Sequence, residues 1–150
     1  MIAVLASIRP DSWNFPLFLH VLGAMVLVGA ATTAVVAQLA PSVVSGDGDR
    51  MRRFSFRTML FAGLPAYIVM RIGAEWMYSK EFGDTDDDPT WIGIGYITAD
   101  IGALLLVIAL ITGGIASWKS KHRLGKVSAL IAAIALAGWI VAVWAMSGKP

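Results

Sequence analysis

The sequence contains no cysteine among its 150 residues. This absence excludes disulfide bonds, thiolate zinc sites, cysteine-ligated iron–sulfur clusters and catalysis by a thiol. Charge is also scarce, because 15% of the residues are charged and 57% are hydrophobic. The net charge of +2 is too small to indicate a nucleic-acid surface, so no nucleic-acid partner is expected. With a mean hydropathy of +0.71, the composition is too apolar for a soluble globular protein and indicates an integral membrane protein.

Four apolar stretches follow one another along a single expected membrane domain, residues 1–150. They predict helices at 15–40, 54–78, 91–118 and 126–146. Each has the roughly 20 residues that a bilayer core requires. The second stretch is the least apolar, since Arg57, Arg71 and Glu75 interrupt it, and Pro65 should kink it. Only helices satisfy the backbone of such stretches in lipid, so we expect an all-α bundle of four transmembrane helices.

The charge of the connecting loops predicts how these helices are oriented. The loop between the first and second expected helices and the loop between the third and fourth are basic. The loop between the second and third helices is acidic. The basic residues are Arg50, Arg52, Arg53, Arg57, Lys119, Lys121, His122, Arg123 and Lys126, and the acidic residues are Glu81, Asp84, Asp86, Asp87 and Asp88. The positive-inside rule puts the basic loops in the cytoplasm and both termini outside the inner or plasma membrane. We expect the lipid bilayer as a partner, with anionic lipids at the basic loops. The sequence is also compatible with a homo-oligomer or a larger membrane complex.

Four ionisable residues fall in the outer half of these stretches: His20, Arg71, Glu75 and Asp100. Such a side chain costs about 2.5–3.5 kcal/mol at the centre of a bilayer, so it usually faces protein or water. If the helix faces that carry them converge, they form an outward-facing pocket for a ligand. Equally, Arg71 and Asp100 are explained by a structural ion pair between the second and third helices. The sequence leaves both interpretations open.

His20 is also the candidate metal ligand. The other histidine, His122, is expected on the cytoplasmic side, so a haem held by two histidines of one chain is not expected. A haem with a single histidine, a histidine–methionine pair, a site shared between subunits, and a copper site remain open.

The run at residues 18–25, FLHVLGAM, lies near the outer end of the first expected helix. Together with the four-helix layout, this run resembles small bacterial four-helix membrane families of unknown function. These families are distantly similar to the membrane domain of copper-resistance protein D and to b-type cytochrome bundles. The resemblance implies that His20 occupies the ligand position.

These observations favour a non-catalytic accessory or binding module, whose pocket holds a small ligand, a metal or haem, or a partner subunit. The alternative is an oligomeric transporter or channel for protons, ions or small molecules that uses the same carboxylates. No nucleophile–base pair or metal-ligand pattern indicates an enzyme.

Overall fold

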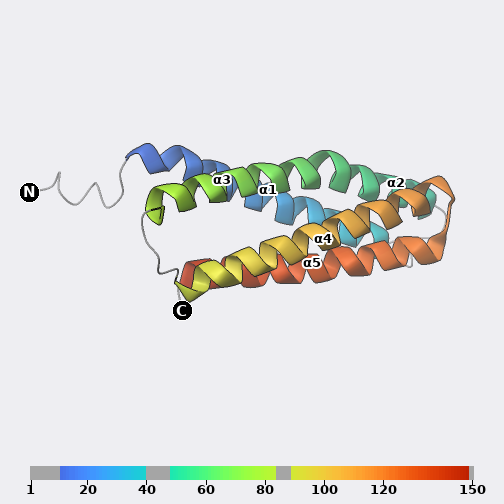
Figure 1. Ribbon diagram of the computed structural model, residues 1–150. Coiled ribbons are helices and arrows are strands. Elements are labelled where there is room, and N and C mark those ends of the chain that lie inside the picture. Colours follow the sequence, from blue (N-terminus) through green and yellow to red (C-terminus); the bar gives the residue numbers. More distant parts are fainter. Residues whose placement is uncertain (1–10, 40–47, 84–88, 149–150) are drawn as a thin grey trace, which may run out of the picture.

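The computed structural model describes residues 11–39, 48–83 and 89–148. Long helices run lengthwise beside one another (Figure 1), and these described residues contain no strand, which confirms the all-α fold class. The elements are η1 (Asp11–Trp13), α1 (Asn14–Leu39), α2 (Gly48–Thr58), η3 (Met59–Gly63), α3 (Leu64–Glu81), α4 (Thr90–Trp118) and α5 (His122–Gly148). Because α2, η3 and α3 follow without a break, they form one long helical rod.

Three segments are long and apolar enough to cross a membrane: Asp11–Leu39, Thr90–Trp118 and His122–Ser147. The α3 helix is less apolar, since Arg71, Glu75 and Lys80 lie within it. Some expected positions lie outside the described residues, namely Ala40, where the first helix was expected to end, and the acidic residues Asp84, Asp86, Asp87 and Asp88.

Two helices begin earlier than the sequence predicts. The second starts at Gly48 rather than near residue 54, and the fourth starts at His122 rather than near residue 126. The reason is that α2 is amphipathic and packs against α1 and α4. Arg52 and Ser55, which lie one turn apart, are buried in that contact. A basic segment that the sequence alone describes as a loop is therefore helical and partly buried.

The interior of the bundle is made mainly of small side chains, whereas large apolar side chains cover its surface. Buried positions include Ala31, Ala34 and Ala135, and exposed ones include Phe61 and Trp118. Water would disfavour such a surface, but lipid does not. Small residues allow helices to approach closely when no hydrophobic effect drives them together, as in a membrane. The packing thus supports the expected membrane environment.

Glycines bring α1 and α3 into close contact. A Cβ at Gly73 would lie 2.5 Å from the backbone nitrogen of His20, and a Cβ at Gly23 would lie 2.5 Å from that of Met70. The most extensive contacts join α1 to α3, α4 to α5 and α1 to α5. The bundle therefore consists of two tight pairs, α1–α3 and α4–α5, which meet along α1 and α5.

Pro65 affects the second helix just before the polar residues of α3. The proline has no N–H to donate, and its ring crowds the carbonyl four residues earlier. The preceding turn, η3, is π-helical, and the N–H of Leu64 donates to the carbonyl of Met59. This wider turn accommodates the proline. The irregularity expected from Pro65 therefore takes the form of a π turn ahead of α3.

The close approach of α1 and α3 makes Gly73 a sensitive position. Gly73→Ala should lower the free energy of unfolding by about 1–3 kcal/mol, because the new methyl group presses on the backbone of α1. The measurement is thermal unfolding of the purified protein in detergent. Gly29→Ala is the matched control, since a Cβ there has no neighbour within 4 Å. It should leave stability unchanged or raise it by up to about 1 kcal/mol. Equal effects of the two variants would contradict the glycine contact.

Candidate functional site

Arg71 lies between two carboxylates. Its Nη2 is 3.1 Å from Oε1 of Glu75, one turn further along α3, and 3.3 Å from Oδ1 of Asp100 on α4. The first pair stabilises the helix, and the second joins α3 to α4. The structure therefore brings together three of the four polar residues that the sequence singles out.

Two tyrosines complete this arrangement. The Tyr96 ring lies against the guanidinium, with the Arg71 Cζ 4.6 Å from the ring centroid. Its hydroxyl donates to Oε2 of Glu75 at 3.0 Å, while the Tyr67 hydroxyl donates to the carbonyl of Ala99 at 3.3 Å. Arg71, Glu75, Tyr96 and Asp100 are called the Arg71 cluster below.

The role of the tyrosines was missed in the sequence analysis, although their spacing carries a signal. Tyr67 lies one turn before Arg71, and Tyr96 lies one turn before Asp100. Residues four apart share a helix face, so each tyrosine accompanies its charged residue. Towards the ends of the same helices, Tyr78 and Tyr96 pack edge to face with ring centroids 5.7 Å apart. Long side chains thus bridge α3 and α4.

The carboxylates of the cluster face away from the bundle interior. The side chain of Arg71 is 28% exposed, whereas those of Glu75 and Asp100 are 50% and 65% exposed. The face of α4 that carries Asp100 points away from the bundle, since Leu104 and Val107 on the same face are exposed as well. Small residues such as Gly95 and Gly102 occupy the inward face of α4 instead.

His20 joins α1 to α3. Its Nδ1 lies 3.1 Å from the carbonyl oxygen of Met70, and because a carbonyl only accepts, Nδ1 carries the proton and donates. Leu27, Ala31 and Ala34 lie on the same face of α1 as His20 and are buried, so this face points into the bundle. The close contact at Gly73 allows the ring to reach the α3 backbone.

A small cavity of about 70 Å³ lies beside His20 and Arg71. Tyr96 and Trp139 also line it, and Glu75 and Asp100 are not among its lining residues. The four predicted residues therefore do not share one pocket. The indole nitrogen of Trp139 is buried and has no hydrogen-bond partner within the described part of the chain. A cavity of this size holds a few water-sized molecules.

His20 offers one ring nitrogen to a ligand. Its Nδ1 donates to the carbonyl of Met70, which leaves Nε2 free, and His122 lies at the opposite end of the bundle beside Arg52. Residues 11–39, 48–83 and 89–148 contain no group of three His, Cys, Asp or Glu side chains that could hold a metal ion. The cavity is also far smaller than the roughly 300–1,000 Å³ of typical cofactor pockets.

Comparison with protein families, with curated proteins and with solved structures finds no match.

Because Arg71 is shared between two carboxylates, we expect substitutions of Glu75 and Asp100 to have non-additive effects on the free energy of unfolding. Glu75→Gln or Asp100→Asn alone should cost about 1 kcal/mol or less, because the remaining carboxylate still pairs with Arg71. The double variant leaves the guanidinium unpaired and should cost about 2.5–3.5 kcal/mol. Thermal unfolding of the wild type, the two single variants and the double variant in lipid nanodiscs measures these changes in stability. Strict additivity would show that the two pairs are independent.

Proposed function

We propose that this chain is a four-span membrane binding module, and that its Arg71 cluster binds a small cation or the ammonium group of a small ligand. The observation that carries the proposal is the charge balance of the cluster. Two carboxylates surround one guanidinium, and both carboxylates are more exposed than Arg71. The cluster thus presents a net negative charge on the outer side of the bundle.

This charge requires a partner within a membrane. A lipid-facing carboxylate is costly, so such groups face water or protein, or pair with another charge. Arg71 neutralises one of the two carboxylates. The remaining charge attracts a cation.

The depth of the cluster follows from the proposed fourth span. The rod formed by α2, η3 and α3 is longer than a bilayer is thick, and α2 carries four arginines. The apolar part from residue 59 to residue 78 has about the 20 residues that a span requires. The cluster then lies in the outer half of the membrane, and α2 extends beyond the cytoplasmic face.

Contacts at the α2 end support the same orientation. Arg52 of α2 lies beside His122 of α5, and Ser120, in the turn between α4 and α5, donates to Asp49 of α2. Both basic segments therefore lie at one end of the bundle. By the positive-inside rule this end faces the cytoplasm.

The packing between the two ends favours binding over transport. Leu27, Ala31 and Leu106 are almost completely buried between the cluster and the cytoplasmic end. A path for ions needs polar groups or water along its length. This apolar layer interrupts such a path within the single chain.

A cation titration tests the proposal. The melting temperature of the purified protein is measured in neutral detergent with increasing Na⁺, K⁺ or tetramethylammonium, at constant ionic strength set by N-methylglucamine chloride. At least one of these cations should raise the melting temperature until the effect saturates. A ligand that binds only the folded state stabilises that state, by about 2.7 kcal/mol at a hundredfold excess over Kd.

The matched variants are Asp100→Asn, which should abolish the saturable increase, and Glu81→Gln, which should preserve it. Glu81 is a carboxylate at the end of α3, outside the Arg71 cluster. An increase that persists in Asp100→Asn, or no saturable increase with any of the three cations, would refute cation binding by the cluster.

The orientation has its own test, made simple by the absence of native cysteine. Ser79→Cys and Ser147→Cys, at the proposed outer end, should react with an impermeant maleimide added to intact cells. Lys121→Cys, in the α4–α5 turn, should react only after the cells are opened. Labelling of the Lys121 variant in intact cells would reverse the topology.

A further inference from the structure

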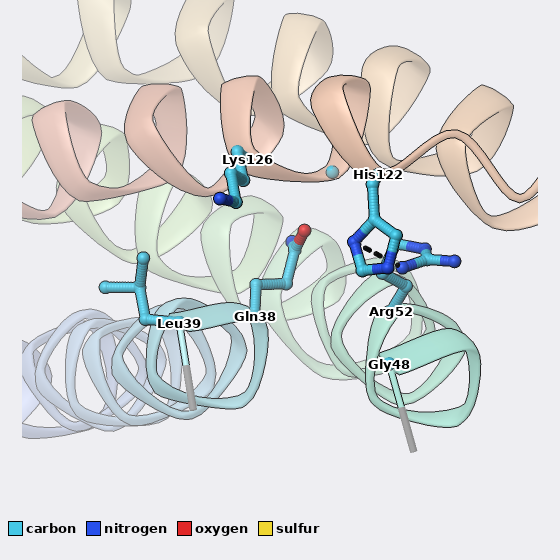
Figure 2. Close-up of a pocket in the computed structure, with 7 residues that line it drawn as sticks. Gln38, Leu39, Gly48, Arg52, His122 and Lys126 are labelled. Atoms are coloured by element: carbon cyan, nitrogen blue, oxygen red, sulfur yellow. Dashed lines mark hydrogen bonds between the residues drawn. The ribbon is translucent and has the colours of Figure 1, made fainter. Parts of the chain in front are cut away.

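A second cavity lies at the other end of the bundle, away from the Arg71 cluster. Its volume is about 290 Å³. The end of α1 and the first turns of α2 and α5 converge on it, and Figure 2 shows the side chains around it. The lining residues are Gln38, Leu39, Gly48, Arg52, His122, Gly125 and Lys126.

Arg52 is the unusual member of this lining, because it is a charged residue only 5% exposed. It forms an ion pair with Asp49, and its Nη1 donates to Nδ1 of His122 at 3.1 Å (Figure 2). The Nε of Arg52 is buried and has no partner among the described residues. A buried donor without an acceptor is costly, so the guanidinium retains binding capacity that these contacts leave unused.

The wall of the cavity holds this arginine in place. A Cβ at Gly125 would lie 2.8 Å from Cδ of Arg52, so the arginine stem packs directly on the α5 backbone. Ser117, near the end of α4, donates to the backbone carbonyl of Arg52 at 3.3 Å. Arg52 is therefore fixed by α4 and α5 as well as by its own helix.

Positive potential surrounds the cavity from several directions. Gly48 is the first residue of α2, and His122 is the first residue of α5. The N–H groups of a first helical turn have no partner within their helix and attract anions. Lys126 adds a full charge, while Asp49 balances that of Arg52. His122 is neutral in this arrangement, because its Nδ1 accepts a hydrogen bond from Arg52.

We propose that this cavity binds a phosphate group, carried either by an anionic phospholipid or by a soluble phosphate. A guanidinium with a free donor, a lysine and two helix N-termini are the groups that recognise phosphate. The volume is at the lower end of ligand pockets, which suits one headgroup. The cavity also lies where α1 ends and α5 begins, which the proposed spans put near the lipid headgroups, and Leu39 supplies an apolar wall.

Binding is measured with the whole chain in neutral detergent, by thermal unfolding and by native mass spectrometry. The three probes are inorganic phosphate, dihexanoyl phosphatidylglycerol and, as the uncharged reference, dihexanoyl phosphatidylcholine. Lys126→Gln should weaken binding about tenfold, since it removes one charged contact to the phosphate. Lys121→Gln is the matched control, because Lys121 is exposed and is not part of the lining. Arg52→Lys should weaken binding similarly, and its folding is checked by circular dichroism.

The binding measurements either support or contradict a phosphate site in this cavity. Saturable, Lys126-dependent binding of phosphatidylglycerol without binding of inorganic phosphate identifies a lipid headgroup site, and binding of inorganic phosphate identifies a soluble ligand. Equal loss in the Lys126 and Lys121 variants would show diffuse charge attraction and overturn the site. Equal binding of phosphatidylcholine, or no binding of either anionic probe, would overturn it as well.

Discussion

The end of the bundle where α3 ends and α4 begins depends on one interaction, the pairing of Arg71 with carboxylates on two helices. The α1–α3 pair is held by close backbone contact and the α4–α5 pair by extensive packing, but α3 and α4 are bridged by long side chains. Arg71 to Asp100 and Tyr67 to Ala99 are two of those bridges. An unpaired guanidinium at this depth would be costly in lipid. The same contact therefore closes the bundle and concentrates negative charge on its surface.

The two ends of the bundle are chemically different. Aromatic rings and exposed carboxylates gather where α3 ends and α4 begins, and arginine, lysine and helix N-termini gather where α2 and α5 begin. Between them lies a layer of small and apolar side chains that includes Leu27 and Leu106. This separation fits a membrane protein with two independent binding regions, one for cationic and one for anionic groups, better than it fits a conducting path.

The sequence predicts the fold class and the inward direction of His20 because both follow from periodic patterns. Ala24, Leu27, Ala31 and Ala34 repeat at helical spacing, and small residues mark a packed face in a membrane helix. The direction of Asp100 could not be predicted in the same way. Nearly every residue of α4 is apolar, so hydrophobic periodicity does not distinguish its lipid face from its packed face. Only the position of glycines such as Gly102, packed against Trp139, identifies the inward side.

Arg52 and His122 were missed for a different reason. A basic segment between two membrane spans is usually a solvated signal for orientation, and nothing in its composition indicates burial. The amphipathic spacing of Arg52 and Ser55 becomes meaningful only when α2 packs on α1, where Ser55 donates to the carbonyl of Ala34 at 2.9 Å. Tertiary contact therefore decides which of several basic residues becomes part of a cavity.

The most direct test of the account is whether the Arg71 cluster is open to water on the outer side. Asp100→Cys and Ile101→Cys differ by one position in the chain, and both native residues are exposed in the structure. A cationic, membrane-impermeant methanethiosulfonate reagent is applied to both variants in nanodiscs. The account predicts that the Asp100 variant reacts about tenfold faster or more, because a thiol that is open to water ionises and meets the reagent while lipid covers residue 101. Equal rates, or protection of the Asp100 variant, would contradict it.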